Sequence, residues 1–302
     1  MRKLATIGEC MVELASDATG GDIRMTGFAG DTCNSAVYLC RLLDPAQFVV
    51  SYVTAIGQDR LSTQMLTFWR DEGIDTSLVY RHAHRTVGMY LIENDAQGDR
   101  RFIYWRDSSA ARTLLDESTR FDFAPLQSYE LLLVSAILPA VMSPAARERY
   151  LTFLTAYRHA GGKVAFDSNY RAQLWESTAV ARDIITRMHR LADIALPSID
   201  DERALFGDSD DRATLQRLQS YGAPELVIKM GDRGPLLPAQ HRHGFLRDGE
   251  RVSVLDATGA GDAFNAAYLA ARLQGASELD AAHAGHALAV RVIAHRGAIL
   301  PR

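Results

Sequence analysis

The chain has 302 residues, of which 47% are hydrophobic and 23% are charged, and its formal net charge is −4 at pH 7. This balance is typical of a globular protein, and the missing basic excess argues against nucleic-acid binding. The three cysteines cannot all pair and lack metal-ligand spacing, so we expect free thiols. We also expect a cytoplasmic protein, because no apolar run approaches the ~20 residues of a membrane-spanning helix.

Short hydrophobic runs alternate with longer segments of helical period along the chain. The predicted strands are Leu4–Ile7, Val49–Ala55, Glu130–Ser135, Lys163–Phe166, Asp193–Leu196, Leu226–Met230 and Val252–Leu255. The predicted helices are Asn34–Leu43, Leu61–Glu72, Ala145–Ala160, Thr178–Leu191, Ala213–Ser220, Asp262–Gln274 and Glu278–Ala294. Runs that are apolar on both faces are typical of buried parallel strands. The alternation predicts a doubly wound, mostly parallel α/β sheet in one domain over residues 1–302.

Two regions, within residues 11–28 and 86–107, interrupt this alternation with short strands. In the second region, two runs whose side chains alternate between two faces flank a loop that contains Gly98. This pattern predicts a hairpin. Four short strands inserted in an α/β frame would form a small separate sheet, whose aromatic side chains need a cover. We interpret this sheet as a lid over the active site; an ordinary edge extension is the alternative.

The segment Asp256-Ala257-Thr258-Gly259-Ala260-Gly261-Asp262 follows a predicted strand and opens a predicted helix. Its two glycines leave successive backbone N–H groups able to point at one spot, and a helix start adds partial positive charge. Such a turn is suited to binding a phosphate. Asp262 would stand beside that phosphate and could accept a proton from an attacking hydroxyl. A glycine turn capped by Asp262 is the plain structural alternative, but it does not account for the whole string.

This string resembles the C-terminal signature of the PfkB (ribokinase-like) carbohydrate kinase family, and the resemblance extends over the whole chain. Further matching segments are Ala29–Asn34, Ala55–Asp59 and Lys229–Gly234. The resemblance implies a ribokinase-like fold and an ATP-dependent kinase that uses Mg²⁺. Within the family it is strongest to members that act on a sugar acid, through Ile7–Leu14, Tyr104–Arg106, Asp167–Arg171 and Arg296–Ile299. It therefore implies transfer of the ATP γ-phosphate to the 6-hydroxyl of 2-keto-3-deoxygluconate.

The resemblance also assigns residues of this chain to roles. The catalytic group would be Asp262 as base, with Gly259, Ala260 and Gly261 forming the anion hole. Substrate would be bound by Gly30, Asp31, Asn34, Tyr90, Tyr104, Arg106, Arg171 and Asp262. The nucleotide would be bound by Ser168, Asn169, Lys229, Gly231, Gly234, Gly259, Gly261 and His286. For His286, a plain helix-surface histidine is an equal interpretation.

The substrate assignment has a separate chemical argument. A keto-deoxy sugar acid carries a carboxylate, and the planar fork of an arginine matches that group. Arg106 and Arg171 each follow a predicted strand end, while Tyr90 and Tyr104 lie on facing hairpin strands. Taken singly, each arginine reads as a surface charge and each tyrosine as a packing residue; together they favour a binding site.

The metal-binding pattern departs from that of the family. The family's Asn-x-x-Glu motif, which organises water around magnesium, corresponds here to a segment from Ser198 to Glu202 that lacks the Asn. We expect Glu202 to lie near magnesium as an outer residue, with a solvated acidic helix start as the alternative. By analogy with the family, Asp256 could bind a monovalent cation such as K⁺. A second departure, Ala29 in place of a glycine, is expected to be tolerated.

Several rival functions remain at this stage. Fructokinase, ribokinase and nucleoside kinase activities are alternatives within the family, and a non-catalytic sugar or nucleotide sensor is an alternative outside it. A nicotinamide dehydrogenase is excluded, because no Gly-x-Gly-x-x-Gly turn follows the first strand. We also expect a homo-oligomer that forms through the β-sheet lid.

Overall fold

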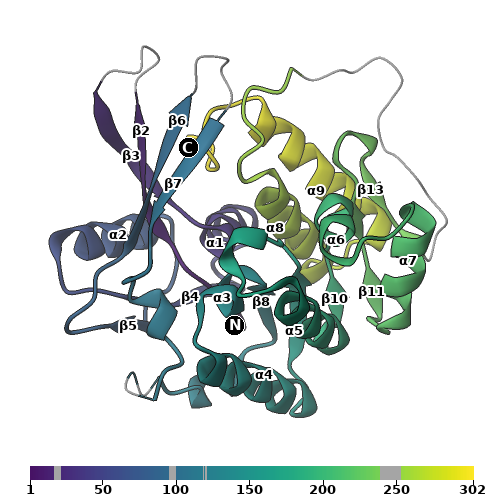
Figure 1. Ribbon diagram of the computed structural model, residues 1–302, viewed down its shortest axis with the longest axis horizontal. Coiled ribbons are helices and arrows are strands. Elements are labelled where there is room, and N and C mark those ends of the chain that lie inside the picture. The colour runs from purple at the N-terminus through teal and green to yellow at the C-terminus, as the bar shows by residue number, and fades with distance from the viewer. Residues whose placement is uncertain (17–21, 95–99, 118, 120, 239–252) are drawn as a thin grey trace.

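The central feature is a sheet of seven parallel strands in the order β11-β10-β9-β8-β1-β4-β5 (Figure 1). The computed structural model describes residues 1–16, 22–94, 100–117, 119, 121–238 and 253–302. The strands are β1 (Arg2–Ile7), β4 (Phe48–Ile56), β5 (Val79–Arg81), β8 (Leu131–Ser135), β9 (Lys163–Asp167), β10 (Ile194–Ala195) and β11 (Glu225–Leu226). The predicted parallel α/β sheet is therefore confirmed.

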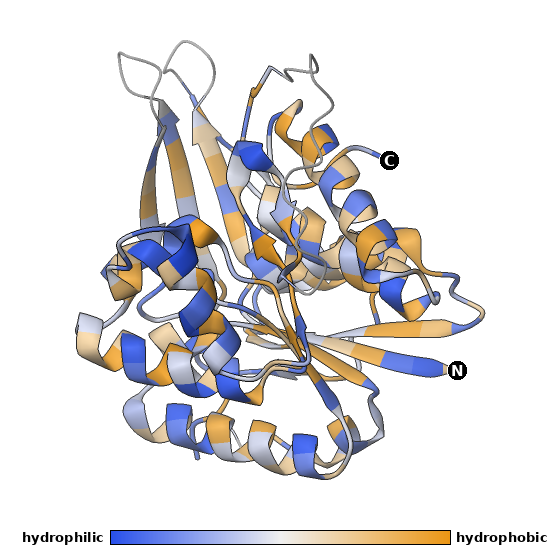
Figure 2. Ribbon diagram, turned by 90° about the vertical axis from the view of Figure 1, so that its right-hand side faces the viewer, coloured by the Kyte–Doolittle hydropathy of each residue, from blue (hydrophilic) through white to orange (hydrophobic). Residues whose placement is uncertain are grey.

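Helices cover both faces of this sheet. One face carries α1 (Asp31–Leu42), α2 (Arg60–Asp71), α8 (Ala260–Leu273) and α9 (Glu278–Ile293), and the other carries α3 (Ile137–Val141), α4 (Pro144–His159) and α5 (Thr178–Leu191). Alternate residues of β1 feed the two cores: Leu4 packs into the first, and Ala5 and Ile7 into the second. In Figure 2 the strands of this sheet are mainly hydrophobic, whereas the helices carry both kinds of residue.

A smaller cluster lies beside β11. It contains α6 (Ile199–Phe206), α7 (Asp211–Ser220) and the two-stranded pair β12 (Ile228–Lys229) and β13 (Pro235–Leu236). Short 3₁₀ turns occur at Ala111–Thr113, Ala124–Ser128, Ala172–Leu174 and Gly231–Arg233. In the part of the chain that the structure describes, no helix is both long and apolar enough to span a membrane.

A second sheet of four strands, in the order β3-β2-β6-β7, projects from the main sheet near α2 (Figure 1). Its strands are β2 (Met11–Ser16), β3 (Ile23–Ala29), β6 (Gly88–Asn94) and β7 (Arg100–Trp105). We call it the small sheet. It is mixed, because β2 and β6 run parallel while the other two pairs are antiparallel. The loop predicted around Gly98 lies outside the described residues.

The strand predicted at Val252–Leu255 is wrong for the residues that can be compared, Ser253–Leu255, which lie in no strand. The amides of Leu255 and Asp256 both donate to the carbonyl of Ile293, at the end of α9, instead of to a neighbouring strand. Val254 is 62% exposed. The apolar residues of this segment therefore lie in an exposed stretch that leads to α8, and not in the sheet.

Candidate active site

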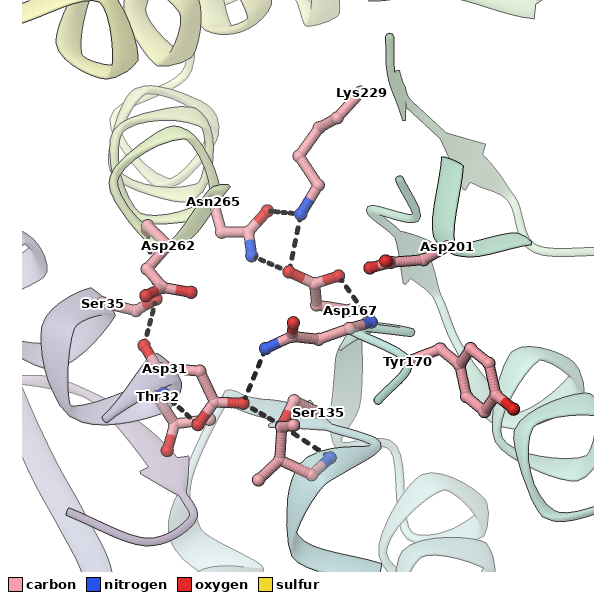
Figure 3. Close-up of polar contacts among 12 residues, drawn as sticks. Asp31, Thr32, Ser35, Ser135, Asp167, Tyr170, Asp201, Lys229, Asp262 and Asn265 are labelled. Atoms are coloured by element: carbon pink, nitrogen blue, oxygen red, sulfur yellow. Dashed lines mark hydrogen bonds and ion pairs between the residues drawn. The ribbon is translucent and has the colours of Figure 1, made fainter. Parts of the chain in front are cut away.

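The site lies where the carboxyl ends of β8 and β9 meet the amino-terminal ends of α1 and α8 (Figure 3). Strand β1 is the first strand of the chain and lies inside the sheet, paired with β4 on one side and with β8 on the other. Later strands are added on both sides of it. The order of strands reverses at β1, and open α/β sheets bind ligands beyond the carboxyl ends at such a point. The fold thus places the polar side chains described below at the expected edge.

Asp262 lies in the first turn of α8 and is buried. Its Oδ2 accepts a hydrogen bond of 2.8 Å from Asn34 Nδ2, and its backbone carbonyl accepts one of 3.1 Å from Ser35 Oγ. Burial, followed by the nearby Asp31 carboxylate, raises the pKa of Asp262 from 3.8 to about 7. A carboxyl group with this pKa can accept a proton near neutral pH and release it again.

The turn that leads into α8 is shaped by Gly259. Its φ of 76° lies in the left-handed region, and a Cβ built there would stand 2.6 Å from Ala298 Cβ. Helices α2, α4 and α5 begin with a side-chain cap, whereas the start of α8 has none. First-turn amides that no side chain caps are available to an anion.

Asp31 ties three elements together at the start of α1. One carboxylate oxygen accepts from the Thr32 amide at 2.7 Å, and the other accepts from Ser135 Oγ and, at 3.1 Å, from Asn169 Nδ2. Burial raises the pKa of Asp31. Asn169 has a positive φ of 29°, a rare conformation outside glycine, which aims its amide at Asp31.

Lys229, Asp167 and Asn265 form a closed set of hydrogen bonds, visible in Figure 3. Lys229 Nζ donates to Asp167 Oδ2 at 2.6 Å and to Asn265 Oδ1 at 3.0 Å. Asn265 Nδ2 donates to the same Asp167 oxygen at 2.6 Å. A Cβ built on Gly261 would stand 3.5 Å from Lys229 Nζ, so the ammonium lies beside the first turn of α8.

The comparisons agree with this geometry. A model of the pfkB family of carbohydrate kinases matches residues 1–302. The chain belongs to this family. It is 42% identical to a 2-dehydro-3-deoxygluconokinase of Escherichia coli K12 (100% of this chain, 98% of that protein) and 40% identical to one of Dickeya dadantii (99% and 97%). A structure described as a putative ribokinase II of E. coli with ATP and Mg²⁺ has a TM-score of 0.85 at 21% identity and covers 99% of this chain and 95% of its own.

In this pfkB kinase, several residues singled out in the sequence come together. Asn34 bonds to Asp262, Asn169 bonds to Asp31, and Lys229 bonds to Asp167 at the end of β9, so side chains from distant segments meet at this edge of the sheet. Around the 3₁₀ turn that follows β12, Gly231 and Gly234 both adopt positive φ, as a sharp loop requires. The hydroxyl of Ser168, in contrast, is buried.

Arg106, whose planar fork we predicted to bind the substrate carboxylate, is itself ion-paired in the kinase. Its side chain is 6% exposed, and both Nε, at 3.0 Å, and Nη2 donate to Glu9 Oε2. A Cβ at Gly88 would press on both partners. Arg171 is more accessible: its side chain is 45% exposed, and its Nη1 pairs with Asp201 at 3.3 Å.

The two tyrosines of the kinase's small sheet face one another as predicted. Tyr90 and Tyr104 are register partners with ring centroids 5.9 Å apart. The Tyr90 hydroxyl is buried and donates to Glu13, however, so Tyr104, which is 41% exposed, is the more accessible of the two.

The acidic residues at the start of α6 point in different directions. Glu202, our predicted outer magnesium residue, is buried; one of its oxygens lies 2.8 Å from His189 Nε2, and the other accepts from Arg217 Nη1 at 2.9 Å. Asp201 instead extends toward Asp167 in Figure 3, and burial raises its pKa. Asp201 therefore faces the site, whereas Glu202 faces His189 and Arg217.

Two further residues predicted as ligands, Asp256 and His286, lie in the segment before α8 and on α9. Asp256 accepts from the amides of Thr258, at 3.0 Å, and Gly297, at 2.6 Å, and thereby fixes the turn before α8. His286 is half-buried on α9, and burial lowers its pKa. Among the described residues, no group of three or more His, Cys, Asp or Glu side chains is arranged to hold a metal ion.

Sequence reasoning missed Asp167 and Asn265 as parts of the site. Asp167 stood within a matched segment, at the end of a predicted strand. Asn265 is buried in a helix whose other buried residues are Ala, Phe, Leu and Tyr. A lone polar residue one turn beyond Asp262, on such a face, was the available signal.

Proposed function

We propose that this kinase transfers the γ-phosphate of ATP to the 6-hydroxyl of 2-keto-3-deoxygluconate, also called 2-dehydro-3-deoxygluconate. The proposal rests on the two relatives named for that activity, which match nearly the whole chain at 40–42% identity. The single structural observation that carries it is Asp262, a buried carboxyl group with a pKa of about 7 beside an uncapped helix start.

The steps of the transfer follow from these positions. The oxygen of the 6-hydroxyl attacks the γ-phosphorus, the bond from that phosphorus to the bridging oxygen breaks, and ADP leaves. The proton of the hydroxyl passes to an Asp262 oxygen. The first-turn amides of α8 and the Lys229 ammonium stabilise the charge of the phosphoryl group in flight, which is the main demand of this reaction.

The residues present fit a bound nucleotide and its metal. The uncapped start of α8 and Lys229 suit phosphate oxygens, and Lys229–Gly234 forms a sharp loop beside them. Mg²⁺ would neutralise the phosphates, and the Asp201 carboxylate would hold its water ligands. Asp256 remains our proposed neighbour of a K⁺ ion, because it anchors the turn before α8; comparing turnover in K⁺ and tetramethylammonium salts tests this.

On the sugar side, we propose that Arg171 and the remaining N–H groups of Arg106 bind the substrate carboxylate. Both side chains lie close enough to Tyr104 to lower its pKa against the raising effect of burial. Gly30, Asn34 and Tyr104 would contact the hydroxyls. A neutral sugar would leave this pair of cations without a partner, which argues against a fructokinase or ribokinase.

The test is a panel of 2-keto-3-deoxygluconate, its galactonate epimer, fructose and ribose, each with ATP and Mg²⁺, followed by ADP release. We expect the highest kcat/KM with a keto-deoxy acid, and we expect Asp262→Asn to lower kcat by about 10²–10⁴-fold. Preference for a neutral sugar would contradict the substrate, and an unimpaired Asp262→Asn variant would contradict the mechanism. A protein that binds sugar without releasing ADP would be a sensor.

We further propose that the small sheet is a lid and that its outer face joins two copies of the chain. Ile23, Met25 and Trp105 are 56%, 42% and 51% exposed. The strand register puts them on one face, opposite Tyr90 and Tyr104. An apolar face of this kind is typical of a self-complementary contact between identical subunits.

A further inference from the structure

The ring formed by Asp167, Lys229 and Asn265 uses its donors and acceptors in a specific way. Asp167 Oδ2 accepts from both other members, while its Oδ1 accepts a hydrogen bond of 3.2 Å from the backbone N–H of Asn169. The Asn265 amide accepts from the ammonium with its oxygen and donates to the carboxylate with its nitrogen. Each of the three groups thus fixes the orientation of the other two.

The ring fixes one cation at one place. A lysine has a flexible four-carbon stem, and holding it in a single conformation is entropically costly. Two acceptors at 2.6 and 3.0 Å hold Nζ of Lys229 beside Gly261, next to the uncapped amides of α8. The structure therefore has a positive charge already placed where the proposed reaction needs one.

From this arrangement we propose that Asp167 and Asn265 are positioning residues that hold Lys229 against the transferring phosphoryl group. The inference rests on the proposed function and deepens it, because it names the side chains that keep the cation in place. Lys229 contributes charge alone: its proton stays on the amine, and the proton of the hydroxyl still passes to Asp262.

A purely structural ion pair between β9 and β12 would not need Asn265. The Asn265 side chain is 2% exposed on α8, where an apolar residue would pack without the desolvation cost of an amide. What the amide adds is the orientation of the ammonium. A structural role and a positioning role therefore predict different kinetics for variants of this residue.

The test compares Lys229→Met, Asp167→Asn, Asn265→Ala and the double variant Lys229→Met/Asn265→Ala. We expect Lys229→Met to lower kcat by about 10²–10³-fold and each positioning variant to lower it by about 10–100-fold, with little change in KM. When Lys229 is already Met, adding Asn265→Ala should lower kcat by less than about twofold, because the effect of Asn265 acts through the lysine. Losses that multiply, or an unchanged kcat in Asn265→Ala, would overturn the proposal.

A matched control lies at the other end of α8. Glu225 accepts from Arg272 at 2.9 Å and from Tyr268, so Glu225→Gln weakens a comparable ion pair far from the site. This variant should lose thermal stability and keep kcat. If Asn265→Ala behaves in the same way, with a lower melting temperature and normal kcat, the ring is structural and the proposal fails.

Nucleotide binding gives a readout that needs no sugar. Binding is measured by calorimetric titration with the non-hydrolysable analogue AMP-PNP and with ADP. We expect Asn265→Ala to lower the affinity for AMP-PNP by about tenfold and the affinity for ADP by much less. Equal effects on both nucleotides would overturn the proposal. If wild-type protein ignores the sugar acid but phosphorylates another sugar, the proposed substrate fails, while the variant ratios measured with that other sugar still decide the role of the ring.

Discussion

The pKa of Asp262 sets the pH range in which the proposed reaction can run. Because the carboxylate is the active form and its pKa is about 7, kcat/KM should rise about tenfold per pH unit below pH 7 and level off above it. A pH profile of kcat/KM checks this. A plateau that extends down to pH 5 would contradict the assignment of Asp262 as the base.

The same ionisation affects stability. The folded-state pKa of Asp262 lies above 3.8, so its contribution to the free energy of unfolding is complete below about pH 3.8 and is lost as the pH rises to about 7. Asp262→Asn carries no charge to bury. It should therefore melt at a higher temperature than wild type at pH 8, with the difference shrinking toward pH 5, as thermal melts at both pH values would show.

The two arginines should respond differently to truncation. Arg106→Ala leaves the Glu9 carboxylate buried without its partner and should destabilise the fold by about 3–5 kcal/mol, measured by urea unfolding. Arg171→Ala removes an accessible side chain, so it should spare stability and raise the KM for the sugar acid by about 10–100-fold, but not the KM for fructose. An equal rise in KM for both sugars would argue against an acid-binding role.

At the residue scale, the sequence predicts the chemistry better than the direction of each side chain. The glycine turn and Asp262 were found because their order is diagnostic. Glu202 was predicted to lie near magnesium, but it is three residues from both Ile199 and Leu205, which are buried. That spacing puts Glu202 on the core face of α6 and turns Asp201 about 100° away from it. The pairing of Arg106 with Glu9 could not be predicted, because it depends on how the segment between β1 and β2 meets the residue that follows β7.

At the scale of elements, the start of α8 depends on one backbone conformation. Gly259→Ala adds a Cβ where φ is 76° and where Ala298 leaves no room. The variant should therefore lower the free energy of unfolding by about 1–3 kcal/mol and lower kcat by about 100-fold or more. Gly275→Ala is the matched control: this residue follows the same helix, has a φ of 91° and has nothing within 4 Å of the added Cβ. It should lose stability alone. Equal kinetic losses in both variants would contradict the special role of the turn.

The elements themselves were largely predictable, because strands that are apolar on both faces and helices with caps have strong local signals. The exceptions have tertiary causes. The run Leu226–Met230 divides between two sheets, with β11 joining β10 and β12 joining β13. The small sheet contains a parallel pair, β2 and β6, whose partners are about 75 residues apart in the chain (Met11 pairs with Gly88), and no hairpin signal can report such a pairing.

At the scale of the whole molecule, the proposed contact between copies makes a prediction about mass. Wild-type protein should elute as a dimer or larger assembly in size-exclusion chromatography with light scattering, and Trp105→Glu should shift it toward the monomer. Val254→Glu, a change at another exposed apolar residue outside the small sheet, should leave the mass unchanged. A monomeric wild type would contradict the contact.

The crowding of acidic groups around the site has a further consequence for how the enzyme meets its donor. Asp31, Asp167, Asp201 and Asp262 gather there, while Lys229 and Arg171 are the basic side chains paired among them. Above pH 7, where Asp262 is ionised, these carboxylates oppose uncomplexed ATP more strongly than its magnesium complex, which carries less negative charge. The reaction rate in a cell would then depend on the concentration of free magnesium. An excess of ATP without magnesium would inhibit the enzyme only weakly, because it seldom occupies the site.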